Sequence, residues 1–317
     1  MKHLIYRLRF STSVHFGRGM LSESASCFSA DTLFSAFYIE ALKLGREEEL
    51  YSAVKSGALC FSDAFPFLKD RYFLPKPMFY VEPKAPGDSK EKKRFKKIQY
   101  IPAELLEDFF RGELEAEHCD LGELGEANGQ MRVVLSRGWD NIPSYGTTAL
   151  KADTRPYCVG DFFFREGNGL YLIFALESDR EGKLIEVLFQ SLSYSGIGGK
   201  RSSGKGRFSY ERRELPGELQ NAMTREGKRY MLLCSALPVE EELESALEGA
   251  SYLLQKRSGF ILSENFSPEQ QKKRDLYTFR PGSCFRHRFQ GGVYPVNEGG
   301  AHPVYRYARG LFLGVGR

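Results

Sequence analysis

Long apolar runs and a cleavable leader are both missing from this sequence of 317 residues. No run of about 18 consecutive apolar residues occurs, which excludes an ordinary transmembrane helix. The N-terminal stretch MKHLIYRLRF carries charges within its apolar part and has no small-residue cleavage site, so it does not look like a secretory signal. We therefore expect a cytoplasmic protein with no membrane partner.

Paired cysteines and clustered metal ligands are missing as well. No C-x-x-C pair, no histidine at zinc-site spacing and no Asp-x-Asp pair of carboxylates occurs. We therefore expect reduced thiols, no metal site and no cofactor. The six cysteines stand singly, at Cys27, Cys60, Cys119, Cys158, Cys234 and Cys284.

The charge is modest in total, +4 at pH 7, but unevenly distributed. Residues 104–126 hold nine acidic residues and one arginine, whereas residues 92–97 hold five cations, and 272–288 is also basic. Such separation of sign suggests a surface divided between a polyanion footprint and something else. For the acidic run, a plain solvated face is the simpler interpretation.

The first two thirds of the chain have the element order strand, helix, strand, strand, helix, strand, which is the ferredoxin-like order. Alternation and helical spacing of apolar residues carry this prediction. Residues 75–154 lack such regularity and read as an insertion. The predicted elements are a strand at 3–10, a helix capped by Ser29 or Asp31 and ended by Gly45, a strand or hairpin at 59–74, a hairpin at 157–178 turning at 166–169, a helix at 182–196 and a strand at 207–214.

A second unit begins near Lys228 and is rich in Gly and Pro, which leaves its strand order open. We predict an α+β protein made of tandem ferredoxin-like (RRM-like) domains. The first domain covers 1–225, with the insertion at about 80–150, and an irregular second domain covers 226–317.

The segment GIGGKRSSGKGRF, residues 196–208, is the most distinctive motif. It is not a Walker A loop, because it follows a helix and precedes a strand, and Gly206 stands where Ser or Thr is needed. The dinucleotide fingerprint fails for the same positional reason. A flexible surface loop remains the simple alternative.

RNA binding fits this segment better. Glycines let a phosphodiester backbone approach main-chain N–H groups. Cations attract and contact phosphates, and serine hydroxyls add neutral hydrogen bonds. The predicted RNA-binding residues here are Gly196, Gly198, Gly199, Lys200, Arg201, Ser202, Ser203, Gly204, Lys205, Gly206 and Arg207.

This loop, in its place after the last helix, resembles that of the RAMP superfamily of CRISPR proteins. Three further stretches, VHFGRG at 14–19, DTRPYCVGDFFF at 153–164 and HPVYRYARG at 302–310, resemble the family of the fourth subunit of type III-A Csm effector complexes. The resemblance spans most of the chain except the insertion. Within the loop it covers Gly196, Gly198, Gly199, Lys200, Gly204, Gly206 and Arg207.

The resemblance implies a non-catalytic subunit that binds the repeat-derived 5′ tag of crRNA. It also implies two protein partners, the large polymerase-like subunit and the first backbone RAMP subunit. The insertion would then be the family's thumb, a β-hairpin that presses on the guide.

Other candidates lie outside the loop. His15, with Gly17 and Arg18 beside it, could contact RNA, and in an alternative function His15 would be the general acid or base of a metal-independent CRISPR RNA-processing endoribonuclease. Tyr305 and Arg306 combine an aromatic ring and a cation, as base-stacking sites do, although packing in an edge strand explains them equally well. A third function is a protein–protein adaptor that uses the acidic insertion.

Overall fold

The computed structural model describes residues 1–84, 89–119, 129–139, 154–263, 266–267 and 269–316. It is a mixed helix-and-strand fold whose main sheet is antiparallel, with the order β11-β1-β10-β5-β6-β7 and β4 also paired to β10. Its strands are β1 (Lys2–Phe10), β4 (Leu59–Phe61), β5 (Phe65–Leu68), β6 (Arg71–Pro75), β7 (Tyr100–Pro102), β10 (Asn168–Leu176) and β11 (Phe208–Glu214).

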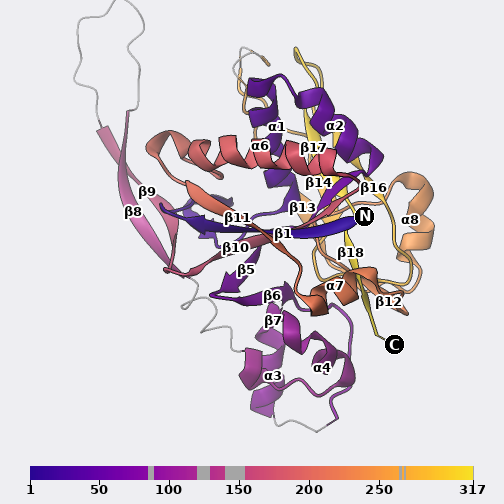
Figure 1. Cartoon of the computed structure of the whole chain (residues 1–317). Helices are drawn as coiled ribbons and strands as arrows, with labels where there is room; N and C mark the ends of the chain where they lie inside the picture. The colour runs from indigo at the N-terminus through magenta and orange to yellow at the C-terminus, as the bar shows by residue number, and fades with distance from the viewer. Residues whose placement is uncertain (85–88, 120–128, 140–153, 264–265, 268, 317) are drawn as a thin grey trace, which may run out of the picture.

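Two long helices, α1 (Ala30–Leu44) and α6 (Asp179–Ser195), lie together over one face of this sheet (Figure 1). Gly45 ends α1 in the left-handed conformation at φ 65°, as its sequence predicts. Ser178 and Glu181 form a capping box at the start of α6. A shorter helix, α2 (Glu47–Ser56), follows α1. The predicted strand at 3–10, the helix ended by Gly45 and the strand or hairpin at 59–74 are confirmed, as are α6 and β11.

The predicted hairpin at 157–178 is wrong. Among the described residues, β9 (Thr154–Phe164) pairs with β8 (Gly129–Trp139), whereas β10 pairs with β1, β4 and β5. All nine residues of β10 are buried, so this strand belongs at the centre of the sheet. The pair β8 and β9, called here the β8–β9 ladder, runs away from the main sheet (Figure 1). A short pair, β2 (Phe16–Arg18) and β3 (Met20–Ala25), packs beside it.

The interpretation of 75–154 as an insertion is also wrong in part, because some of these residues belong to the main sheet and to the core. Strand β7 extends the main sheet, and the apolar side chains of Ile98, Ile101, Leu106 and Phe109 are buried in the central cluster. Part of the acidic run at 104–126 forms ion pairs with basic side chains, such as the pair of Glu104 with Arg71 at 2.5 Å. The other elements here are α3 (Ser89–Lys97), η1 (Ala103–Leu105), α4 (Leu106–Arg111) and η2 (Ala116–Cys119).

The C-terminal region does not repeat the first unit. Among its described residues beyond 228, one helix is present, where a second ferredoxin-like unit needs two. Glycines at positive φ, including Gly249, Gly259, Gly282 and Gly291, divide it into short strands. Helix α7 (Gly217–Thr224) precedes this region. The elements of the region are β12 (Arg229–Leu232), α8 (Glu240–Leu247), β13 (Leu254–Arg257), β14 (Leu276–Phe279), β15 (Cys284–Phe285), β16 (Gly291–Pro295), β17 (Tyr305–Arg309) and β18 (Phe312–Val315).

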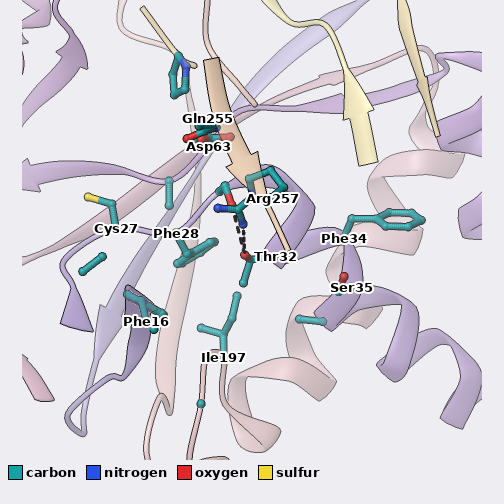
Figure 2. Close-up of a pocket in the computed structure, with 18 of the residues that line it drawn as sticks. Phe16, Cys27, Phe28, Thr32, Phe34, Ser35, Asp63, Ile197, Gln255 and Arg257 are labelled. Atoms are coloured by element: carbon teal, nitrogen blue, oxygen red, sulfur yellow. Dashed lines mark hydrogen bonds between the residues drawn. The ribbon is translucent and has the colours of Figure 1, made fainter. Parts of the chain in front are cut away.

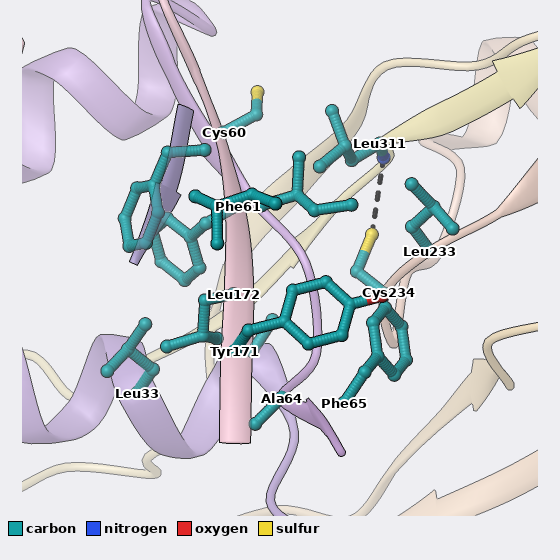
Figure 3. Packing of buried hydrophobic residues seen from close by; sticks show 14 of the residues in the cluster. Leu33, Cys60, Phe61, Ala64, Phe65, Tyr171, Leu172, Leu233, Cys234 and Leu311 are labelled. Carbon is teal, nitrogen blue, oxygen red and sulfur yellow. Dashed lines mark hydrogen bonds between the residues drawn. The ribbon is translucent and has the colours of Figure 1, made fainter. Parts of the chain in front are cut away.

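One apolar core joins the two parts of the chain. Leu33, Phe61 and Tyr171 from the first part cluster with Leu233 and Leu311 from the second (Figure 3). The N–H of Leu311 donates to the sulfur of Cys234 at 3.2 Å, so even the polar groups here have partners. The C-terminal region is thereby held in a fixed position over the first part, and the space between them forms the site described next.

Candidate nucleic-acid interface

A cavity of about 1250 Å³ opens between α1, the Gly-rich loop and the C-terminal region. Figure 2 shows Phe16, Phe28, Thr32 and Ile197 around it, with Arg257 reaching in from β13. The cavity brings together six of the residues predicted from sequence to bind RNA: His15, Gly17, Gly198, Gly199, Arg201 and Tyr305.

The lining of the cavity is strongly cationic. Among the described residues that line it, one is acidic, Asp63. Aromatic rings, including Phe28, Tyr38 and Tyr305, also line the cavity. The lining cations are Lys43, Lys76, Lys96, Arg201, Arg257, Lys273 and Arg280. Arg201 belongs to the Gly-rich motif, Lys96 to the basic run 92–97, and Lys273 and Arg280 to the basic stretch 272–288. Lys43, Lys76 and Arg257 stand outside these stretches, so no sequence pattern pointed to them.

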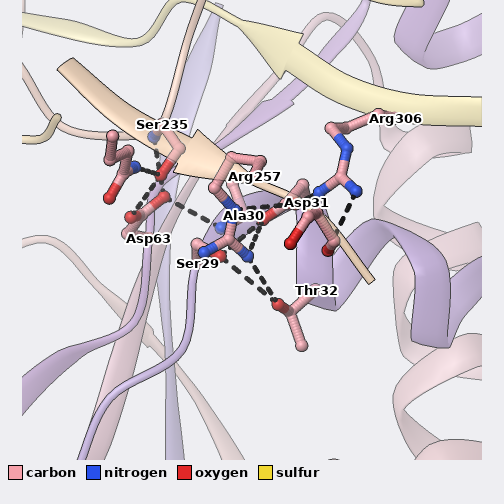
Figure 4. Close-up of polar contacts among 10 residues, drawn as sticks. Ser29, Ala30, Asp31, Thr32, Asp63, Ser235, Arg257 and Arg306 are labelled. Carbon is pink, nitrogen blue, oxygen red and sulfur yellow. Dashed lines mark hydrogen bonds and ion pairs between the residues drawn. The ribbon is translucent and has the colours of Figure 1, made fainter. Parts of the chain in front are cut away.

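Buried acids and arginines form a polar network on one side of the cavity (Figure 4). Asp31 accepts hydrogen bonds from Arg257 at 2.8 and 3.1 Å and pairs with Arg306. Burial alone would raise the pKa of Asp31, but the two arginines outweigh it and hold this pKa below its ordinary value.

The pKa of Asp63 is shifted in the opposite direction, upward. Its oxygens accept from the N–H groups of Ala30 and Ser235, both at 2.8 Å, and from the hydroxyl of Ser235 at 2.9 Å. Burial outweighs these bonds and raises the pKa of Asp63 to about 6. Asp63 thus satisfies the first N–H of α1 and ties it to the C-terminal region.

This network corrects two predictions made from the sequence. Asp31 is not the N-cap of α1, because Ser29 occupies that position and Asp31 lies in the first turn. Arg306 is 5 % exposed and its guanidinium is held by Asp31 and the carbonyl of Ser258, so it is not placed to contact an RNA phosphate. Four consecutive residues of β17, from Arg306 to Arg309, are buried, so Arg306 lies in the interior of the protein beside the buried acid.

The glycines of the loop face the chain's own backbone. A Cβ on Gly196 would lie 2.6 Å from the carbonyl oxygen of Lys205, and one on Gly198 would lie 2.7 Å from that of His15. Gly199 and Gly206 are confined in the same way, by His15 and Ile197. Gly204 alone of the five meets open space, so close packing within the protein accounts for most of the glycines that sequence analysis assigned to phosphate approach.

The cations of the loop differ in their surroundings. Lys205 is 16 % exposed and pairs with the buried Asp161. Arg201 lines the cavity from a short 3₁₀ turn, η3 (Arg201–Ser203), after Lys200, which adopts φ 59°. Arg207, Ser202 and Ser203 are exposed. Arg201 therefore faces the cavity, whereas Lys205 is engaged in an ion pair within the protein.

His15 is buried beside the cavity. Its Nδ1 lies 2.7 Å from the carbonyl oxygen of Gly160, which fixes Nδ1 as the protonated nitrogen of the neutral ring. Gly17 follows on β2, and the side chain of Arg18 lies outside the described part of the structure. Tyr305 stacks on Tyr51, with ring centroids 4.5 Å apart, and meets Tyr38 edge-on.

No group of three or more metal-ligating side chains occurs among the described residues. None of the described helices has the length and apolar character that crossing a membrane requires.

Comparison with known proteins decides the family. Residues 225–315 match the family model of the CRISPR Csm4 C-terminal domain. A Csm4 protein of Mycobacterium tuberculosis is 38% identical over 316 residues, which cover 99% of this chain and 98% of that protein. The chain belongs to the Csm4 family. A Csm4 protein of Streptococcus thermophilus is 35% identical, covering 99% of each chain. The membership expected from the three motifs and the loop is thereby confirmed.

Solved structures of Csm4 complexes share the fold. A chain in the crystal structure of a Csm3–Csm4 subcomplex of a type III-A CRISPR–Cas interference complex matches with a TM-score of 0.66 and 18% identity, covering 100% of both chains. A chain in a Csm1–Csm4 cassette in complex with cA4 matches with a TM-score of 0.60 and 20% identity, covering 99% of this chain and 98% of that one. These matches support the mixed helix-and-strand fold described above.

Proposed function

We propose that this Csm4-family chain is a non-catalytic RNA-binding subunit of a type III-A CRISPR effector complex, and that it holds the repeat-derived 5′ tag of crRNA in the cavity. The observation that carries the proposal is the charge of the lining, which holds seven cations and one acid among the described residues. Two of these cations already have acidic partners, because Arg257 pairs with Asp31 and Lys43 pairs with Glu40. A single-stranded RNA supplies both of the groups that such a lining binds, phosphates for the cations and base faces for the aromatic rings.

The cations that line the cavity come from separate segments of the chain. Lys96 and Arg201 lie on segments that are far apart in the chain, and Lys273 comes from the C-terminal region. Burial lowers the pKa of Lys273, with Arg306 adding to the effect, so an incoming phosphate would restore favourable surroundings for its charge. Phosphate contacts of this kind bind the RNA backbone largely independently of the RNA sequence.

Solved complexes of other Csm4 chains support two proposed protein partners. Csm4 chains occur with Csm3 in one solved complex and with Csm1 in another. We propose that this chain likewise binds the large polymerase-like subunit and the first backbone RAMP subunit in the cytoplasm. We interpret residues 1–225 as a ferredoxin-like RAMP domain. We propose that its thumb, expected at about 80–150, includes the β8–β9 ladder, whose strand β9 extends to Phe164, and that it presses on the guide.

The test is RNA binding by the full chain over a series of salt concentrations. The probe is a labelled single-stranded RNA with the repeat-derived tag at its 5′ end, and a scrambled-tag RNA runs beside it with EDTA present. In the variant Lys96→Gln/Arg201→Gln the slope of log affinity against log salt should become shallower by about 1.4, since each lost phosphate contact on a single strand removes about 0.7.

A matched control removes two charges elsewhere. Lys97 and Lys183 are exposed and do not line the cavity. Lys97→Gln/Lys183→Gln should leave the slope as it is in the wild type. Equal slopes for all three proteins would refute the cavity as the RNA site, and cleavage of the RNA in EDTA, abolished by His15→Ala, would replace the proposal with the endoribonuclease function.

A further inference from the structure

The base of the β8–β9 ladder is tied to the Gly-rich loop by a buried ion pair. Asp161, on β9, is 1 % exposed and pairs with Nζ of Lys205, which is 16 % exposed. Ser13 lies between the two segments. Its hydroxyl donates to Asp161 Oδ2 at 3.2 Å and accepts from Lys205 Nζ at 3.4 Å. The three side chains come from three separate segments of the chain and form one closed set of contacts.

Backbone hydrogen bonds flank this ion pair on both sides. On the ladder side, Val14 and Phe162 exchange two N–H···O bonds of 2.9 Å, and His15 binds the carbonyl of Gly160. On the loop side, the N–H of Gly206 donates to the carbonyl of Ser13 at 2.8 Å, and the N–H of Gly199 donates to that of His15 at 2.8 Å. Residues 13–16 are therefore held between the loop and the ladder.

The glycines of the loop make this packing possible. Gly198, Gly199 and Gly206 have no room for a Cβ because His15 or Ile197 lies against them. Side chains at Gly198 and Gly199 would push the loop away from His15, and a side chain at Gly206 would collide with Ile197 within the loop itself. The bare backbone of the loop thus brings Lys205 within reach of Asp161.

We infer that Lys205 and Asp161 are positioning residues, which set the orientation of the β8–β9 ladder relative to the cavity, and that Lys205 is not a phosphate ligand. Removing Lys205 to bind RNA would leave the carboxylate of Asp161 buried without its cation, and its Oδ1 already lacks a hydrogen-bond partner among the described residues. The inference rests on the proposed function for its effect on RNA, because the ladder is taken there as the element that meets the guide.

Two measurements on the full chain test the inference separately. Hydrogen–deuterium exchange in the peptide covering 157–164 reports the attachment of β9, and β10 serves as the internal reference. The salt slope for the tagged RNA reports the phosphate contacts. The variants are Lys205→Gln, the neutral pair Lys205→Gln/Asp161→Asn, and Arg207→Gln, which removes an exposed cation from the same loop.

The expected pattern differs for each variant. Lys205→Gln should lose protection in 157–164 and bind RNA that extends into the guide more weakly, with the wild-type salt slope. The neutral pair should recover the protection and the affinity, because an amide pair leaves no buried charge. Arg207→Gln should keep the protection and, as a phosphate contact, lower the slope by about 0.7.

The inference is overturned if Lys205→Gln and the neutral pair both lower the slope by about 0.7 while the protection of 157–164 stays as in the wild type. Lys205 would then be a phosphate ligand. If Lys205→Gln does not fold, the double variant Lys205→Gln/Asp161→Asn still tests the inference. Its salt slope should fall if Lys205 contacts a phosphate and should stay at the wild-type value if Lys205 only positions the ladder. Absence of RNA binding by the wild type would refute the proposed function, while the exchange measurement would still test the attachment.

Discussion

The ring of Tyr307 lies flat against that of Phe61, with centroids 4.3 Å apart and planes 16° apart. The Tyr307 hydroxyl also accepts from the N–H of Phe61 at 3.0 Å and donates to its carbonyl at 3.2 Å. The two residues lie on either side of the domain boundary expected near 225, so packing is continuous across it. This contact helps to fix the C-terminal wall of the cavity.

Tyr307→Phe should therefore destabilise the whole chain. The variant keeps the stacked ring but leaves the buried N–H of Phe61 without its acceptor, at a cost of about 1–3 kcal/mol. Urea unfolding followed by circular dichroism would measure it. An unchanged free energy of unfolding would mean that the hydroxyl is not needed to satisfy the backbone.

The ionisation of Asp63 should make the folded chain less stable as pH rises. Its pKa is about 6 in the folded chain, against an ordinary value of 3.8, so between pH 4 and pH 6 the folded state binds more protons than the unfolded state. Its contribution to stability should therefore fall as pH rises through this window, by roughly 3 kcal/mol at about 1.4 kcal/mol for each unit of pKa. Asp63→Asn should abolish this component.

The measurement for Asp63 is the difference in unfolding free energy between wild type and Asp63→Asn at pH 4 and at pH 7. Other groups titrate in both proteins, so the difference isolates Asp63. A difference that is the same at both pH values would contradict the raised pKa.

Arg306→Met should destabilise the chain without changing the salt slope for RNA. Its charge is buried against Asp31, and breaking a buried ion pair on one side costs about 3–5 kcal/mol. Arg257 remains beside Asp31 and reduces the loss toward the lower value. Thermal unfolding and RNA binding at temperatures well below the transition would separate the two effects. A shallower slope in the folded variant would restore Arg306 as a phosphate ligand.

Gly206→Ala and Gly204→Ala should differ sharply. Both residues have positive φ, 78° and 80°, which costs an alanine about 1–2 kcal/mol. Only at Gly206 would the added methyl also collide with backbone, that of Ile197. The midpoint of thermal unfolding should fall much further for Gly206→Ala. Equal midpoints would show that the loop does not pack as described.

Much of the first part of the fold is predictable from sequence because local signals agree with the tertiary structure. Helix α1 has apolar residues at helical spacing and a glycine at its end, and α6 has a capping box. The pairing of β9 was missed for a physical reason. A Gly-containing turn joins it to β10, so the local pattern favours a hairpin, but the wholly buried β10 gains more by pairing with β1 and β5.

The site was predictable only where its residues are close in sequence. The Gly-rich loop and His15 were found, and the structure brings both to the cavity. Lys43, Lys76 and Arg257 carry no motif, and only the folding of three distant segments brings them to one lining. The internal ion pair of Lys205 could not be predicted either, because Lys205 lies in the loop and its partner Asp161 lies on β9, in a separate segment of the chain.

The location of bound RNA tests the central claim most directly. Ultraviolet cross-linking of tagged RNA to the full chain, followed by mass spectrometry of the cross-linked peptides, would identify the contacting residues. The account predicts cross-links in peptides that line the cavity, above all those containing Phe28, Tyr38 and Tyr305. Cross-links confined to surfaces away from the cavity, such as α8 or the acidic residues of α2, would contradict it.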